Sequence, residues 1–436
     1  MRRRDLTLAL AAGAGIASLP LHVRLALAQA ESSDDETDAV ALELLLGELD
    51  EVGGQRIDAV GRSEIPATDR SSIQVNGTDA GLQAPQLTAE LRAAMAARNY
   101  WRLAPEQRPV PRWAPISRAP DYQHLQGFSL SSTQFEVSAA ILRTLAQRNA
   151  FRINDRRPVL IFGLRGCKIA NGADVSPWAA THRLEAIEPN HLDCRCVVGV
   201  MRKSDGMISL FRGSTVPAVA SIYKALAADG WGPGLLPTGL YAYRAGSVSG
   251  GVSAQRGALL IAGRYCVLRT TDDLVFDAFS AGDVWSAGYS NHIHCGGDVS
   301  RPDSAGGQAI PGGYRGVSAW TATGLWAEFR RAAGLVDEDG MPIAADETPS
   351  FQYMLLTGRE AALAYQGGAV FNGAYLRLRP GSSGEDVRAL QQRLFSDYTG
   401  IAGARVDGDF GMLTAFALLL YKKDSEGEFT SPIYLA

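Results

Sequence analysis

The sequence predicts an α+β protein of several domains, with a helical N-terminal region, a β-rich central domain and a small three-helix C-terminal domain. The chain has 436 residues, more than one hydrophobic core usually organises, since single domains cluster at roughly 100–200 residues. Short apolar runs separated by glycine and polar residues fill its middle part, which is typical of strands. Helical periodicity is found on both sides of this region.

Composition and charge exclude some classes of function. The formal net charge is −4, and no run of Lys and Arg beyond the first residues could follow a phosphate backbone. Nucleic acid is therefore not an expected partner. The five cysteines form no Cys-x-x-Cys pair, so nothing indicates a zinc knuckle or a thioredoxin-type motif. We predict no cofactor and no bound metal, and we expect most cysteines to be buried as small apolar residues.

Residues 1–30 have the pattern of a cleaved export signal. Arg2-Arg3-Arg4 precede an Ala- and Gly-rich stretch, and Ala28-Gln29-Ala30 offers small residues to signal peptidase. The apolar stretch, residues 8–20, is too short to span a hydrocarbon core of ~30 Å. We therefore expect no membrane span after cleavage, with a membrane-spanning helix as the alternative. The Arg-Arg-x-Leu order resembles a twin-arginine signal, which implies a periplasmic or extracellular protein.

Residues 31–150 are expected to contain helices and linkers. A short helix and then a linker rich in Gly, Ser, Asp and Thr are predicted up to residue 81. Helical patterns follow at residues 86–98 and 132–149. The proline-rich stretch 105–120 between them predicts an extended loop.

Residues 151–335 are predicted to form the β-rich domain. Glycine, Asp and Asn separate its short apolar runs, which favours an antiparallel arrangement. The runs are residues 159–162, 197–200, 208–211, 240–243, 259–261, 265–268 and 274–276. A helix is expected at 323–333, and a connecting segment at 336–374, for which we make no secondary-structure prediction.

The C-terminal segment, residues 375–436, begins with a helix that has its own start signal. Ser383 and Asp386 can cap the helix, and Val387, Leu390 and Leu394 then lie on one face. Such spacing predicts an amphipathic helix with its apolar side against a partner.

A glycine turn then leads into a second helix. The turn is Asp407-Gly408-Asp409-Phe410-Gly411, and Thr414 follows it. Residues 375–423 resemble the peptidoglycan-binding domain, whose pattern is Gly-Ser-x-Gly-x-x-Val-x-x-Leu-Gln and then Asp-Gly-x-Phe-Gly-x-x-Thr. The resemblance implies a self-contained module with peptidoglycan as its partner. The candidate residues of this peptidoglycan-binding module are Ser383, Val387, Leu390, Asp407, Gly408, Phe410 and Thr414.

Three segments of the central region resemble the L,D-transpeptidase catalytic domain, a β-rich fold that acts on peptidoglycan stem peptides through a cysteine acyl-enzyme. The first two are residues 206–217 and 236–241. The third runs from His294 to Ser304-Ala305-Gly306-Gly307-Gln308. The resemblance implies that His294 is the orienting histidine. Gly307 stands where the family has its cysteine.

The glycine removes the group on which the family's chemistry depends, a thiolate that attacks the amide. Cys295, beside His294, is one alternative nucleophile, although neighbouring strand residues face opposite ways. Ser304 is another; it would need His294 and an acid such as Asp283 or Asp298.

A metal site is a further alternative, because His292 and His294 share one face of a strand and Asp298 follows. Two hypotheses therefore result. The first is an exported peptidoglycan-binding protein with a degenerate L,D-transpeptidase-like domain. The second is a peptidoglycan enzyme that uses an atypical nucleophile or a metal.

Overall fold

The computed structural model describes residues 113–227, 233–248, 255–270, 276–277, 283–288, 290–298, 301–302, 304–315, 321–337, 339–343, 349–367, 376–397, 405–426 and 431–435. The predictions for the export signal, the linker and the helix at 86–98 lie outside these residues. Within the described residues, none of the helices combines the length and the apolar character needed to cross a membrane.

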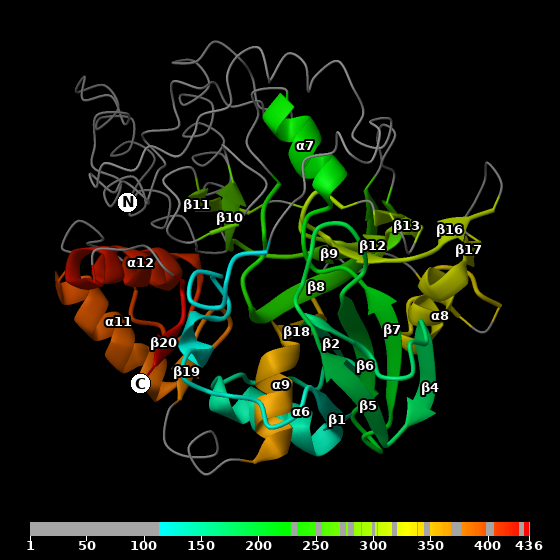
Figure 1. The fold of residues 1–436 in the computed structure, drawn as a ribbon, viewed down its shortest axis with the longest axis horizontal. Helices are drawn as coiled ribbons and strands as arrows, with labels where there is room; N and C mark the ends of the chain where they lie inside the picture. The colour runs from blue at the N-terminus through cyan, green and yellow to red at the C-terminus, as the bar shows by residue number, and fades with distance from the viewer. Residues whose placement is uncertain are drawn as a thin grey trace.

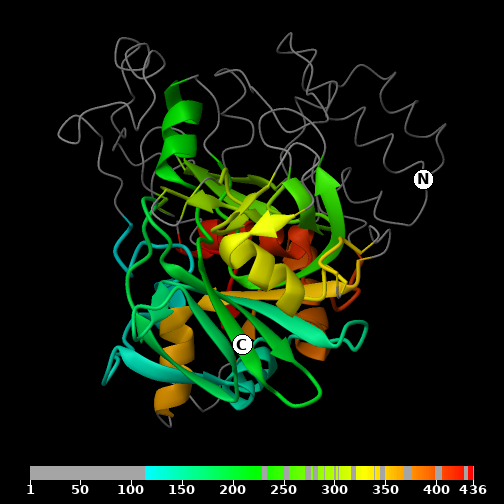
Figure 2. The same cartoon turned by 90° about the vertical axis from the view of Figure 1, so that its right-hand side faces the viewer.

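The described residues form a mixed α/β structure built on a nine-stranded sheet, with six α-helices around it (Figures 1 and 2). Its strand order is β15-β12-β9-β8-β18-β2-β6-β7-β4. Neighbours are antiparallel except β12 with β15 and β18 with β2, which are parallel. The strands are β2 (Val159–Arg165), β4 (Val175–Ala179), β6 (Cys196–Arg202), β7 (Ile208–Gly213), β8 (Gly239–Val248), β9 (Gln255–Ile261), β12 (Ile293–Cys295), β15 (Gln308–Ile310) and β18 (Phe351–Thr357).

The sheet curls, because its edge strand β15 also contacts the end of β7. Ser214, directly after β7, bridges Ala309 of β15 in antiparallel fashion. Both backbone N–H···O distances of this bridge are 2.8 Å. The contact brings the edge strand β15 next to β7, which is the second strand from the opposite edge of the sheet.

The apolar runs predicted as strands at 159–162, 197–200, 208–211, 240–243 and 259–261 all lie within sheet strands. Every residue of β2 is buried, since both faces of this central strand are covered. Its residues alternate between two cores: Leu160 and Phe162 pack with α6 (Ala139–Arg148), whereas Ile161 packs with Phe329 of α8 (Gly324–Ala332). Helix α8 confirms the helix predicted at 323–333.

The predicted helix at 132–149 starts too early. Residues Gln134–Ser138 form strand β1, and only then does α6 begin, with the Ser138 side chain accepting a hydrogen bond from Ile141 N. Phe135 and Val137 are buried at alternate positions, which is a strand period. β1 belongs to a three-stranded sheet with β5 (Thr181–Ala186) and β3 (Cys167–Ile169).

The segment without a prediction supplies a strand to the centre of the large sheet. β18 lies between β8 and β2, and α9 (Gly358–Gln366) follows it directly. Thr357 and Glu360 form a capping box at the start of α9. The described part of the proline-rich stretch forms turns instead of an extended loop, with Arg118 N and Ala119 N both bonded to Pro115 O.

Smaller elements surround the sheet. They comprise the 3₁₀ helix η5 (Gln123–Leu125), helix α7 (Val219–Ala227) and three two-stranded ribbons: β10 (Cys266–Thr270) with β11 (Asp283–Ala287), β13 (Gly297–Asp298) with β14 (Arg301–Pro302), and β16 (Gly313–Tyr314) with β17 (Ala322–Thr323).

The C-terminal segment contains two helices and a two-stranded ribbon among its described residues. They are α11 (Glu385–Asp397), α12 (Met412–Glu426) and the pair β19 (Arg377–Leu378) with β20 (Tyr434–Leu435). The two helices predicted from their residue patterns are therefore present, and the apolar face predicted for the first one is buried. The described residues of this segment contain no third helix of the predicted three-helix domain.

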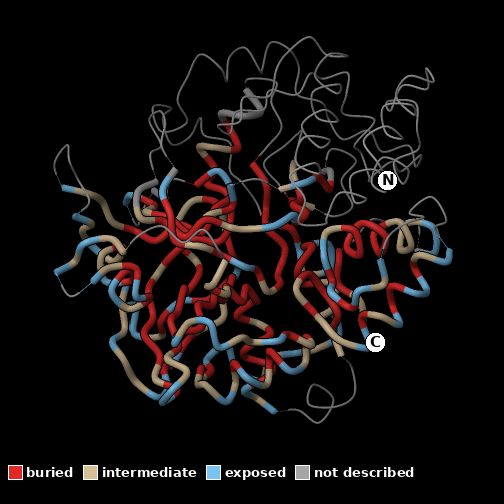
Figure 3. Tube along the Cα trace, turned by 180° about the vertical axis from the view of Figure 1, so that it is seen from behind, coloured by how far each residue is buried: buried red, intermediate tan, exposed pale blue. Residues whose placement is uncertain are grey.

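This segment shares a hydrophobic core with the rest of the protein, so it is not self-contained. One cluster of buried residues joins Val387 and Phe410 to Cys266 and Trp285 of the β10–β11 ribbon and to Val219 of α7. Figure 3 shows buried residues in the sheet and in the C-terminal helices alike. Separating the two parts would expose this apolar surface to water.

A buried ion pair adds a polar link between the same parts. Arg379, after β19, donates to Glu360 of α9 at 2.7 Å, and both side chains are almost completely buried. His124 Nε2 lies 2.9 Å from the same carboxylate. Burial alone would raise the pKa of Glu360, but the charges of Arg379 and His124 lower it below its ordinary value.

The network continues into the large sheet. Arg379 also donates to Thr238 Oγ1 at 2.7 Å, and Thr238 N donates to Asp121 at 2.9 Å. Asp121 in turn pairs with Arg165 of β2. A chain of buried polar contacts therefore runs from the C-terminal segment to the central strand.

Candidate functional site

The candidate site is the corner where β12 and β15 run side by side. The backbone N–H of Gln308 donates to His292 O at 2.7 Å, and His294 pairs in register with Ala309. Because these two strands are parallel, the residues just before each of them meet at the same edge. The His-x-His segment and the Ser304–Gly307 turn are therefore neighbours in space.

His294 packs directly on Gly307. His294 is 5% exposed, and its Nδ1 lies 2.8 Å from Cys295 O. A carbonyl can only accept, so the proton of this hydrogen bond is on Nδ1. A Cβ built on Gly307 would lie 2.8 Å from His294 Nε2 and 2.7 Å from His292 O. Glycine fits here because there is no room for a side chain.

Ser304 holds the turn and does not face the imidazole. Its hydroxyl donates to Gly307 O at 2.7 Å and accepts from Gly306 N at 3.1 Å, and the residue is 3% exposed. The hydroxyl proton therefore stays within the turn. The side chain of Asp283 lies outside the described residues, and Asp298 is exposed on β13.

Cys295 lies on the other face of β12 from His294. It packs with Ile293 against the core on the α8 side of the sheet. Burial raises the pKa of its thiol, against smaller opposite effects of the Gly297 backbone and Arg330. A nucleophilic cysteine needs the reverse shift, because the thiolate is the reactive form. The geometry and the pKa both disfavour Cys295 as a nucleophile.

His292 is neutral at physiological pH. Its pKa is lowered to about 4, first by burial and then by the charges of His294 and Arg244. Its Nδ1 accepts a hydrogen bond from Ile261 N at 3.1 Å. No group of three or more His, Cys, Asp or Glu side chains in the described part of the chain is arranged to hold a metal ion. His292, His294 and Asp298 therefore do not form the predicted alternative metal site.

Asn291 organises the corner and was not identified from the sequence. Its side-chain amide donates to Gly306 O at 2.6 Å and to Gly234 O at 3.0 Å. Its backbone N–H donates to Tyr265 OH at 3.1 Å, and its carbonyl accepts from Tyr243 OH at 2.8 Å. Asn291 follows Ser290, which has a φ of 56°. No sequence signal distinguishes such an asparagine from a surface loop residue.

The turn of the C-terminal segment is held by Gln391 of α11, the residue that falls on the Gln of the Gly-Ser-x-Gly-x-x-Val-x-x-Leu-Gln pattern. Gln391 Nε2 donates to Asp407 Oδ1 at 2.8 Å and to Thr414 Oγ1 at 3.1 Å, and its Oε1 accepts from Gly408 N at 2.8 Å. Gly408 has a φ of +80°. This network gives Asp407, Gly408 and Thr414 of the Asp-Gly-x-Phe-Gly-x-x-Thr pattern a structural role.

Most candidate residues of the C-terminal segment are buried. The buried ones are Val387, Leu390, Gly408, Phe410 and Thr414. Asp407 is exposed and Ser383 is half-buried. Only these last two therefore have side chains that a large ligand could contact.

The corner as a whole lacks an activated nucleophile among the described residues. It consists of one buried imidazole beside a backbone turn that Ser304 and Asn291 fix in position. Comparison of the chain with protein-family models, with curated proteins and with solved structures gives no match.

Proposed function

We propose that this chain is an exported peptidoglycan-binding protein, and that its central domain is a degenerate L,D-transpeptidase-like domain that binds without acylation. The observation that carries the second part is the contact between His294 and Gly307. The imidazole lies 2.8 Å from where a Cβ would stand. Gly307 itself supplies no sulfur, and even a Cβ at this position would be too close to the histidine.

Two further features support loss of catalysis. Cys295 faces away from His294 and has a raised thiol pKa. Ser304 directs its proton to Gly307 O. Acyl transfer needs a nucleophile with an aligned base, and neither side chain has one.

The proposal of peptidoglycan binding is supported by the sequence patterns, because residues of each pattern contact one another in the fold. Histidine and the glycine-rich turn of the third central segment are 13 residues apart in the chain, from His294 to Gly307, yet they are in contact. In the C-terminal segment, Gln391 of the first half of the pattern likewise contacts Asp407 and Gly408 of the second half. Patterns that meet in space are harder to attribute to chance than patterns along the chain.

Co-sedimentation with purified peptidoglycan tests the proposal. The full chain without residues 1–30 is mixed with insoluble sacculi, and with chitin as a polysaccharide that has no stem peptides. We expect sedimentation with sacculi only. Equal amounts in both pellets, or in neither, would contradict specific peptidoglycan binding.

The same preparation tests the absence of acylation. Incubation with a carbapenem, an acylating probe for cysteine transpeptidases, should leave the intact mass unchanged. An adduct that maps to Cys295 would instead support the enzyme hypothesis.

A further inference from the structure

Ser176 and His182 form a hydrogen-bonded pair that the sequence patterns did not select. Ser176 lies on the edge strand β4 of the large sheet, and His182 lies six residues later on β5 of the three-stranded sheet. The serine Oγ lies 2.9 Å from His182 Nδ1, and His182 Nε2 lies 2.7 Å from Ile208 O. A carbonyl can only accept, so the imidazole proton is on Nε2, and Nδ1 accepts a hydrogen bond from the serine hydroxyl. The hydroxyl therefore directs its proton at a base.

The pair and its surroundings have the arrangement of a nucleophile, its base and an orienting group. Ile208 O is the orienting group, because its hydrogen bond to Nε2 holds the ring in place. This bond persists when Nδ1 takes up a proton, and the carbonyl dipole then stabilises the imidazolium. His182 is 7% exposed and Ser176 is half-buried, so the base is shielded while the nucleophile lies nearer the surface.

A β-bulge directly follows the serine. The register between β4 and β7 shifts between Ser176 and Ala179, so that Pro177 and Trp178 lie opposite the single residue Ser209. Bulges re-aim side chains and are frequent next to active sites. The Ser209 hydroxyl also donates to Ser176 O at 3.2 Å, which holds the backbone of the serine from the neighbouring strand. The nucleophile is thus positioned by a sheet, which is more precise than a loop.

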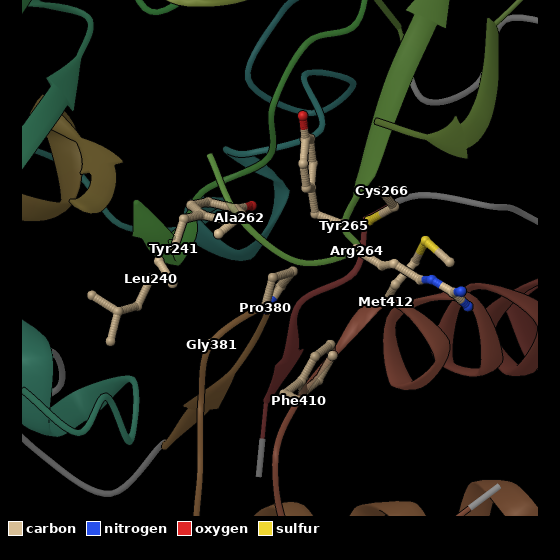
Figure 4. Close-up of a pocket in the computed structure, with 12 residues that line it drawn as sticks. Leu240, Tyr241, Ala262, Arg264, Tyr265, Cys266, Pro380, Gly381, Phe410 and Met412 are labelled. Carbon is tan, nitrogen blue, oxygen red and sulfur yellow. The ribbon is translucent and has the colours of Figure 1, made fainter. Parts of the chain in front are cut away.

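Two other hydroxyl or thiol groups show the contrast. The Ser304 hydroxyl donates to a carbonyl instead of an imidazole. Cys266 is the one serine or cysteine among the described residues that line a hollow of about 170 Å³ between the large sheet and the C-terminal segment (Figure 4). No histidine is among these lining residues, and burial raises the pKa of the Cys266 thiol to about 12. Neither group therefore has the base that Ser176 has.

We propose that Ser176 and His182 are the nucleophile and general base of a second site, which hydrolyses esters of small carboxylic acids. Ser176 Oγ attacks the ester carbonyl carbon while its proton moves to His182 Nδ1. The bond from that carbon to the alcohol oxygen then breaks, and the leaving oxygen takes the proton from Nδ1. Water attacks the resulting acyl-serine and loses a proton to Nδ1, and Ser176 regains that proton as the acid leaves. One ester and one water thus give one acid and one alcohol.

The surroundings of the pair favour an ester with a short acyl group. An ester reacts with an activated hydroxyl without the strong stabilisation of the oxyanion that an amide needs. A short acyl group fits best, because Ser176 is half-buried and the bulge at Pro177 lies beside it. In the strand order the site lies at the opposite edge of the large sheet from β15. It uses none of the residues on which peptidoglycan binding is proposed, so the two proposals succeed or fail separately.

Two probes test this site on the full chain without residues 1–30. p-Nitrophenyl acetate, an activated ester with a small acyl group, reports turnover through release of p-nitrophenol. Diisopropyl fluorophosphate should form a stable phosphate ester on Ser176, as fluoride leaves and the hydroxyl proton passes to His182. Peptide mass spectrometry locates this adduct. We expect hydrolysis of the acetate faster than in buffer, and an adduct at Ser176.

Three variants assign the activity to the pair. Ser176→Ala should reduce hydrolysis to the rate in buffer and remove the adduct. His182→Gln keeps a donor for Ile208 O but has no base, and it should slow hydrolysis by about a hundredfold. Ser396→Ala is the matched control, because Ser396 is an exposed serine on α11 whose hydroxyl donates to Arg393 O at 2.8 Å; it should hydrolyse the ester as the wild-type protein does.

Three results would each overturn the proposal: hydrolysis no faster than in buffer, hydrolysis that Ser176→Ala leaves unchanged, or a wild-type protein without an adduct at Ser176. The adduct is mapped on the wild-type protein, so this result does not depend on the folding of any variant.

Discussion

Replacing Arg379 by Met should destabilise the whole protein. The guanidinium is completely buried and lies 2.7 Å from the carboxylate of Glu360, which is 1% exposed. Met has a similar length but leaves this carboxylate charged in the interior. Removing one partner of a buried ion pair costs about 3–5 kcal/mol. We expect a loss of this size in the free energy of unfolding at pH 8.

The loss should be smaller at pH 5, because His124 can replace the missing cation. In the wild-type protein the pKa of His124 is lowered to about 4, mainly by burial; the Glu360 charge raises it and the Arg379 charge lowers it. Without Arg379 the last effect disappears, so the pKa of His124 rises. Protonated His124 then pairs with Glu360, and this stabilisation is present below the raised pKa and lost above it.

Urea unfolding monitored by tryptophan fluorescence measures both effects, with each variant compared to wild type at the same pH. Lys168→Met is the control, because Lys168 forms an exposed ion pair with Glu185 at 3.2 Å; it should cost less than about 1 kcal/mol. Adding Glu360→Gln to Arg379→Met should recover most of the loss, since no buried charge remains. A loss at pH 8 no larger than that of the control, or the same loss at both pH values, would refute the reasoning.

Three other perturbations test separate parts of the structure. Three buried or half-buried histidines have pKa values lowered to about 4 from 6.5: His124, His191 and His292. Between pH 4 and pH 6.5 each of these histidines is neutral in the folded state and takes up a proton on unfolding. The free energy of unfolding should therefore fall as the pH falls from 6.5 to 4, by up to ~1.4 kcal/mol per pH unit for each histidine. A free energy of unfolding that does not change with pH in urea titrations would contradict this. Phe410→Ala should cost about 3–5 kcal/mol, in one transition because the core is shared; a separate early transition would show that the C-terminal segment unfolds alone. Gly307→Ala should cost about 1–3 kcal/mol in thermal melts through overpacking, whereas Gly411→Ala, with open space around the glycine, should cost less.

The strands that could be predicted are those with a local signature. Runs such as 197–200 and 208–211 are short, apolar and bounded by turn residues, so their type does not depend on distant partners. β18 is equally apolar, but its parallel partner β2 lies almost two hundred residues earlier in the chain. A buried run of this kind cannot be distinguished from a helix by its period alone. In the same way, Phe135 and Val137 fit the start of the helical pattern that continues to residue 149. Only the pairing of this segment with β5 shows that it is a strand.

The candidate site, too, could be predicted only in part from the sequence. Sequence patterns selected His294 and Gly307, and parallel pairing of β12 with β15 places them in contact. The direction of the Ser304 hydroxyl, the side of β12 on which Cys295 lies, and the bonds of Asn291 depend on tertiary packing. The sequence also gave no indication that the C-terminal segment packs against the rest of the protein. Its helices have the same amphipathic pattern whether they pack on each other or on a neighbouring part of the chain.

The most direct test of the central claim is mass spectrometry of the muropeptides released from sacculi after co-sedimentation with the full chain lacking residues 1–30. We expect the protein in the pellet and a muropeptide profile identical to that of untreated sacculi. New cross-linked or shortened stem peptides would contradict binding without acylation. Protein left in the supernatant would contradict peptidoglycan binding itself.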